Sequence, residues 1–152
     1  MKKSRIYLDT SVIGGCFDKE FEEYSNILIN EMISGNKIGV ISDITLKELE
    51  QAPEQVKTFF KAIIGKLEIL KMNFDITELA NIYINESVIS KNYFDDALHI
   101  AFATVYQLDM LVSWNFKHIV NYNRIRMINA VNIKSGYKTL DIYSPMEAID
   151  EK

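Results

Sequence analysis

The sequence predicts an α/β fold, a three-layer sandwich in which a central, mainly parallel sheet of four to five strands is flanked by helices. Three observations support this. Short apolar runs recur along the chain, amphipathic segments with helical spacing separate them, and only six glycines and two prolines interrupt the pattern. Short buried strands that alternate with helices are typical of a parallel sheet covered on both faces. With 152 residues, 48% of them apolar, we expect a single domain spanning 1–152.

Five segments read as strands, because each is short, apolar and bounded by polar residues. They cover residues 6–8, 38–41, 67–70, 110–113 and 140–142. The first of them ends directly on a carboxylate, Asp9.

Helices are expected between these strands, over residues 20–34, 43–49, 56–64, 76–87 and within 122–133. Asp75, with Glu78 three residues on, predicts the start of the helix at 76. Asn92 is expected to cap a further helix that reaches residue 105. Ser144 followed by Pro145 predicts a terminal turn of helix.

The composition of the chain excludes several classes of protein. One cysteine, Cys16, excludes an intramolecular disulfide framework, and two histidines leave no common structural zinc pattern, so we expect a cytoplasmic protein. No apolar run approaches the ~20 residues needed to cross a bilayer, and the N-terminus lacks a secretory apolar stretch, so no membrane role is expected. The net charge of −4 implies that any nucleic-acid contact is local. Candidate basic positions are Lys2, Lys3, Arg5, Lys117, Arg124, Arg126, Lys134 and Lys138.

Acidic side chains follow several of the predicted strands. Asp9 ends the first strand, Glu48 lies one turn into the helix after the second, and Asp95 and Asp96 open the helix before the fourth. Residues 113–115 end the fourth strand. Sites in open parallel sheets form at the carboxyl ends of the strands, so we expect these residues to meet at one rim.

Each acid also has a structural interpretation. Asp9 could cap the turn that follows it, Glu48 has capping-box spacing with Thr45, and Asp95 would complement a helix N-terminus. Asp95 and Asp96 lie on different sides of their helix, and we take Asp96 as the site residue. The joint arrangement favours a functional role, because acids gathered at one rim repel each other unless a cation is present.

At these residues the sequence resembles the PIN domain and, within it, the VapC-like toxins of bacterial and archaeal toxin–antitoxin pairs. The matching segments are 8–12 (LDTSV), 45–49 (TLKEL), 95–101 (DDALHIA) and 111–115 (LVSWN). They occur in the family's order and span most of the chain. Each segment is short, so the resemblance depends on the ordered set.

The resemblance implies a PIN-like domain with Mg²⁺- or Mn²⁺-dependent ribonuclease activity. Asp9, Glu48 and Asp96 would be the catalytic, metal-binding acids. A cognate antitoxin protein, an RNA substrate and a tendency to form a homodimer are implied as well.

One position departs from the family pattern. Many relatives carry a fourth acid just after the last core strand, whereas this chain has Asn115 and, three residues on, His118. Asn115 supplies an oxygen but no charge, so either Asp95 compensates or a second metal ion binds weakly.

The resemblance leads to a hypothesis for the site. Asp9 and Asp96 are direct metal ligands, Glu48 is a ligand or a water-orienting base, and Asn115 is an auxiliary contact. A divalent ion with open positions would activate water for attack on the RNA phosphate.

Four further side chains near the rim have two interpretations each. Thr10 and Ser11 are expected either to hydrogen-bond the phosphate or to cap the turn. Trp114 either stacks on a base or fills the core. His99 either reaches a carboxylate or packs its helix against the sheet, and we take packing as the default.

The first rival function is a PIN-like module with an incomplete acid set, which would bind RNA or a partner without hydrolysing it. The second is another metal-dependent phosphoryl enzyme, and the sequence speaks against it. A phosphatase of the haloacid-dehalogenase type needs a second Asp two residues after Asp9, where Ser11 stands, and a receiver domain needs a lysine where residues 113–115 have none. The sequence contains no Gly-x-Ser-x-Gly nucleophile elbow of a hydrolase, no Walker loop and no Gly-x-Gly-x-x-Gly nucleotide-binding motif.

Overall fold

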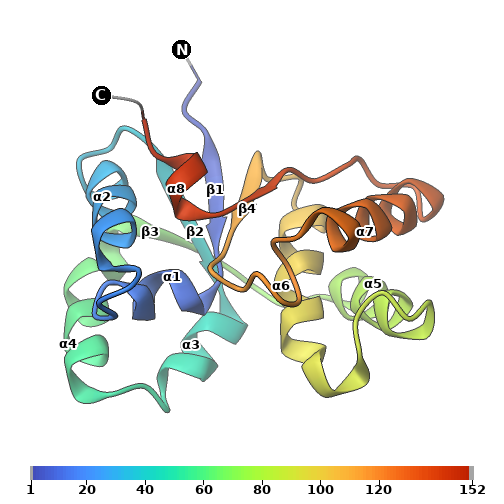
Figure 1. Ribbon diagram of the computed structural model, residues 1–152, viewed down its shortest axis with the longest axis horizontal. Helices are drawn as coiled ribbons and strands as arrows, with labels where there is room; N and C mark the ends of the chain where they lie inside the picture. The colour runs from blue at the N-terminus through green and yellow to red at the C-terminus, as the bar shows by residue number, and fades with distance from the viewer. Residues whose placement is uncertain (1, 151–152) are drawn as a thin grey trace.

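The computed structural model describes residues 2–150, which form a five-stranded parallel sheet between two layers of helices (Figure 1). The strands are β1 (Arg5–Leu8), β2 (Ile38–Ser42), β3 (Leu67–Leu70), β4 (Met110–Val112) and β5 (Ile142–Tyr143). Their order is β3-β2-β1-β4-β5, and every pairing is parallel. The predicted α/β class, the mainly parallel sheet and the three layers are confirmed.

Alternation along the central strands divides the core in two. In β1, Ile6 and Leu8 face one helical layer and Tyr7 faces the other, because successive strand side chains point to opposite faces. Neighbouring strands follow the same rule, so β2 gives Val40 to one side and Ile41 to the other. The sheet is therefore buried on both faces, as its apolar strands predict.

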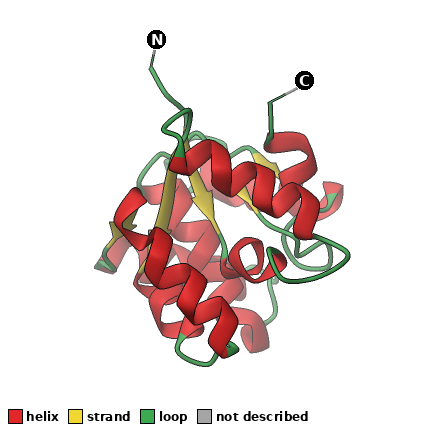
Figure 2. Cartoon of the chain, turned by 90° about the vertical axis from the view of Figure 1, so that its left-hand side faces the viewer, coloured by secondary structure: helices red, strands yellow, loops and turns green. Residues whose placement is uncertain are grey.

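One layer contains α1 (Thr10–Gly15), α2 (Glu22–Ile33), α4 (Glu54–Ile63) and α8 (Pro145–Ala148). Figure 2 looks at this layer, and the strands lie behind its helices. The other layer contains α5 (Phe74–Asn85), α6 (Phe94–Val105) and α7 (Tyr122–Lys134), on the opposite side of the sheet in Figure 1. At 13 residues α7 is the longest of these, and none of the helices within 2–150 is long and apolar enough to cross a membrane.

The helix α3 (Asp43–Leu49) begins where β2 ends and contacts both layers. Ser42 caps it by accepting the backbone N–H of Ile44, and Thr45 accepts the backbone N–H of Ser42. The predicted capping pair of Thr45 with Glu48 is therefore wrong. Because Thr45 closes the cap, the Glu48 side chain is left for another contact.

Three helix starts differ from the sequence prediction. The structure has a helix, α1, at Thr10–Gly15 where only a turn is expected. Asn73, rather than Asp75, caps α5 by accepting the N–H of Ile76. A short 3-10 turn, η2 (Lys91–Tyr93), precedes α6, so Asn92 lies within that turn and caps no helix. A second 3-10 turn, η1 (Ile64–Lys66), joins α4 to β3.

Candidate active site

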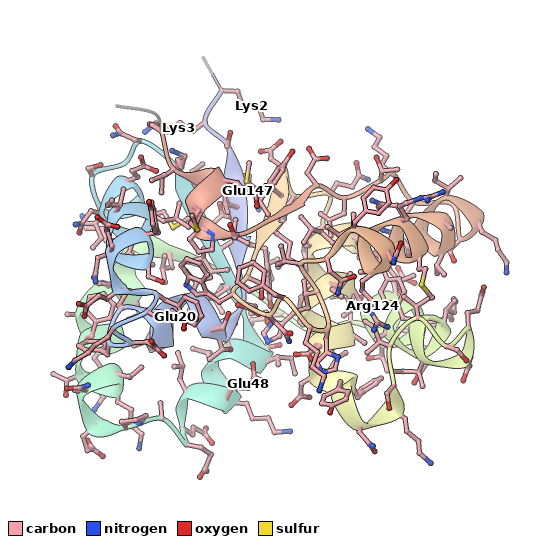
Figure 3. All side chains as sticks on the ribbon, viewed as in Figure 1. Lys2, Lys3, Glu20, Glu48, Arg124 and Glu147 are labelled. Atoms are coloured by element: carbon pink, nitrogen blue, oxygen red, sulfur yellow. The ribbon has the colours of Figure 1, made fainter. Side chains whose placement is uncertain are left out.

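Side chains from four elements meet at the carboxyl end of the sheet. Asp9 follows β1, Glu48 lies on α3 after β2, Asp96 is in the first turn of α6, and Ser113 follows β4. Hydrogen bonds between these elements tie them together, as described below. Figure 3 shows Glu48 at the end of the molecule opposite Lys2 and Lys3. The predicted meeting of the acids at one rim is therefore observed.

Asp9 is the most buried of the three acids, at 4% exposure. Its Oδ1 accepts from the backbone N–H and the hydroxyl of Ser11, and its Oδ2 accepts from the Ser113 hydroxyl at 2.6 Å. Asp9 thus caps α1 and also joins β1 to β4. The predicted cap is confirmed, and the same carboxylate lies at the edge of the sheet where the site is predicted.

Glu48 is held from two sides through one oxygen. Its Oε1 accepts from the Thr10 hydroxyl and bonds His99 Nε2, both at 2.6 Å. Burial alone would raise the pKa of Glu48, but the hydrogen bond and positive charge of His99, aided by Thr10, lower it overall. Glu48 is therefore kept ionised.

A buried hydrogen-bonded chain continues from Glu48 into the core. His99 is 2% exposed, and its Nδ1 lies 2.6 Å from the hydroxyl of Tyr7, which is 2.7 Å from the hydroxyl of Ser42. Burial lowers the pKa of His99, but the Glu48 hydrogen bond and the acids around it raise it overall. The default prediction for His99 is wrong in one respect, because this buried residue also bonds a carboxylate, that of Glu48. Sequence reasoning missed Tyr7 and Ser42 entirely.

Asp96 is half-buried and accepts a hydrogen bond from Asn115. Asn115 Nδ2 donates to Asp96 Oδ2 at 3.2 Å, while its Oδ1 accepts the backbone N–H of His118 at 2.9 Å. Burial, followed by the negative charge of Asp9, raises the pKa of Asp96 to about 6. Asn115 therefore orients Asp96 with a donor, at the position where the resemblance to PIN domains predicts an acid.

The structure also places three other candidate residues, Asp95, Arg5 and Trp114. Asp95 is exposed and, within the described chain, makes no hydrogen bond or ion pair, yet it lines a small hollow together with Asp96. Arg5 is at the opposite end of β1, where it pairs with Glu68 at 2.7 Å. Trp114 is buried, stacks on Phe21 with ring centroids 4.3 Å apart and donates to Ser25, so its core interpretation holds.

The donor set suits a hard divalent cation. No three His, Cys, Asp or Glu side chains in the described part of the chain converge closely enough to enclose a metal ion. Mg²⁺ is usually held by one or two carboxylates plus water and substrate phosphate, so a preformed cage is not required. Asp96 Oδ1 and Glu48 Oε2 accept no hydrogen bond among residues 2–150, which leaves both oxygens available as ligands.

Comparisons with known proteins find similarity in fold. No family model matches the chain, and no curated protein matches its sequence. DNA-bound VapBC from Salmonella typhimurium contains a chain that is 18% identical, with a TM-score of 0.62, covering 93% of this chain and 98% of that one. VapBC2 from Rickettsia felis, bound to a DNA fragment from its promoter, gives 22% identity, a TM-score of 0.59 and coverages of 92% and 98%.

A third solved structure is Mycobacterium tuberculosis VapC20, described as a sarcin-ricin loop cleaving toxin. It is 14% identical, with a TM-score of 0.53, and the match covers 70% of this chain and 86% of that one. These matches establish the fold, and the resemblance to VapC-type PIN domains predicted from the motifs is confirmed at that level.

Proposed function

We propose that this chain is a Mg²⁺- or Mn²⁺-dependent endoribonuclease that hydrolyses RNA phosphodiester bonds, and that it is the toxin of a toxin–antitoxin pair. One observation carries the proposal. Three carboxylates from separate elements meet at the carboxyl end of the sheet, and burial together with the charge of Asp9 raises the pKa of Asp96 to about 6. Negative charges gathered at one edge of the sheet repel each other and favour a bound cation.

The comparisons support the biological role. Several solved structures of this fold are VapBC toxin–antitoxin complexes, and one is described as cleaving the sarcin-ricin loop. RNA as substrate and an antitoxin as partner are the corresponding inferences for this chain.

Each residue has a distinct role in the proposed site. Asp9 and Asp96 would hold the ion, which when bound lowers the pKa of water and stabilises charge on the phosphate. Glu48 is a further ligand, because its lowered pKa makes it a weak proton acceptor. Thr10 and Ser11 fix the orientation of Glu48 and Asp9.

The test is cleavage of single-stranded and structured RNAs by chelator-treated protein, with and without Mg²⁺ or Mn²⁺. Asp9→Asn and Asp96→Asn should each lower the metal-dependent rate by at least a hundredfold, on the order of the loss of a key transition-state charge interaction. Glu48→Gln tests the third acid. Its matched control is Glu50→Gln, which changes an exposed acid just beyond the end of α3. Equal rates with chelator and with metal would contradict the proposal.

A second candidate is a PIN-like module that binds RNA or a partner without cleaving it. Asn115 favours it, because the group facing Asp96 is a donor and adds no negative charge. Asn115→Asp discriminates between the two functions. A nuclease should retain or gain metal-dependent activity, whereas a binding module should show RNA binding without cleavage under any metal.

The cellular role has its own test. Expression of the wild-type chain in a bacterial cytoplasm should arrest growth, and Asp96→Asn should relieve the arrest. A homodimer is part of the same proposal. Light scattering of the purified protein gives the oligomeric state directly.

A further inference from the structure

A hollow of about 460 Å³ lies beside the acidic site, a size within the range of ligand pockets. It is lined by two isoleucines and by Ser87, Ser90, Lys91, His118 and Arg124. Lys91 also lines the smaller hollow that contains Asp95 and Asp96. The two hollows therefore share Lys91 as a lining residue.

The lining of the larger hollow is basic in a chain whose net charge is −4. It contains Lys91, His118 and Arg124 and no carboxylate. None of the ion pairs found among residues 2–150 involves Lys91 or Arg124. The Arg124 guanidinium is fixed by donating to the carbonyl of Val88, which leaves its other N–H groups for a ligand. Figure 3 shows Arg124 on the α7 side of the molecule.

An aromatic pair bridges the two hollows. The rings of Tyr93 and His118 stack with centroids 3.9 Å apart and an interplanar angle of 30°. Tyr93 is 40% exposed, so it retains open ring surface. Burial, followed by the charges of Lys117 and Arg124, lowers the pKa of His118.

We propose that Lys91, Tyr93, His118 and Arg124 form a subsite for single-stranded RNA next to the scissile phosphate. Lys91 and Arg124 bind a backbone phosphate, and a base stacks on the open face of Tyr93. Basic side chains that follow the backbone, together with an aromatic ring that accepts any base, are the usual means of binding single strands. The subsite rests on the proposed ribonuclease function, because the acids define where the RNA is cut.

The experiment measures binding of a fluorescein-labelled oligouridine by the full chain in EDTA, from 50 to 300 mM salt. Lys91→Gln should weaken binding and reduce the slope of log K against log salt by about 0.7, the value for one lost phosphate contact on a single strand. Lys91 is exposed and makes no hydrogen bond among the described residues, so the variant should fold normally. Tyr93→Leu should weaken binding about tenfold with little change in the salt slope. Lys2→Gln, at the opposite end of the molecule, is the control.

The outcomes separate the subsite from the nuclease function. Slopes and affinities of Lys91→Gln and Tyr93→Leu equal to those of the wild type would overturn the subsite, even if the protein cleaves RNA. Binding that depends on both residues would support the subsite, even if no cleavage is found under any metal. Arg124→Gln should act like Lys91→Gln, with its melting temperature measured in parallel because Arg124 also holds the backbone of Val88.

Discussion

Replacing Asp96 with asparagine should stabilise the metal-free protein at neutral pH. The pKa of Asp96 is about 6 in the folded chain, against an ordinary value of 3.8. The folded state therefore binds the proton more tightly than the unfolded state, and stability falls as the pH rises from about 4 to 6. The difference of about 2.2 pKa units corresponds to about 3 kcal/mol at 1.36 kcal/mol per unit. Because the side chain is only half-buried, solvent screening reduces this, and we expect about 1–2 kcal/mol.

Asparagine suits this test because it removes the charge and keeps an acceptor for the amide of Asn115. In EDTA at pH 7.5, Asp96→Asn should raise the melting temperature by about 2–8 °C, at 2–4 °C per kcal/mol for a chain of this size. At pH 5 the wild-type carboxyl is mostly protonated when folded, and the gain should fall to roughly half.

Asp95→Asn is the matched control for that measurement. Both acids lie in the first turn of α6, so both substitutions lose the same favourable interaction with the helix N-terminus, but Asp95 is exposed. The control should be neutral or slightly destabilising at both pH values. A lower melting temperature for Asp96→Asn at pH 7.5, or the same gain at both pH values, would refute the reasoning.

Three further predictions concern packing, the buried network and the metal. Gly15→Ala would place a Cβ 2.8 Å from Trp114 Nε1 and should lower the free energy of unfolding in urea by about 1–3 kcal/mol. Gly14→Ala, whose Cβ would have no atom within 4 Å, is the control and should be neutral or stabilising by up to about 1 kcal/mol. Tyr7→Phe removes the hydroxyl that bonds His99 and should cost about 1–3 kcal/mol, with an exposed tyrosine as control. Mn²⁺ at about a hundred times its Kd should stabilise the wild type by about 2.7 kcal/mol in thermal unfolding, and variants lacking one of the three acids should lose this gain.

The sheet and the positions of the acids are predictable from the sequence because they depend on local pattern. Short apolar strands with acids at their ends specify both the parallel sheet and the edge at which Asp9, Glu48 and Asp96 meet. The different helix sides of Asp95 and Asp96 add the choice of Asp96, which agrees with their burial. No knowledge of long-range contacts is needed for either conclusion.

The features that the sequence pattern does not predict depend on contacts between distant segments. The helix α1 contains two glycines, which disfavour helix formation, and it depends on the Asp9 cap and on packing in the core. The chain from Glu48 through His99 to Tyr7 joins three segments up to 92 residues apart. Alternation places Tyr7 on the sheet face opposite Ile6 and Leu8, but it does not identify the histidine that its hydroxyl meets.

The position of Trp114 gives the protein an internal optical reporter. It is the only tryptophan, its ring lies against Phe21, and its backbone N–H donates to the Ser11 hydroxyl that also bonds Asp9. Excitation at 295 nm therefore samples one indole linked to the end of the sheet where the active site is proposed. A change in its emission on adding a cation or RNA reports a rearrangement around Asp9 in the unmodified protein, without a label.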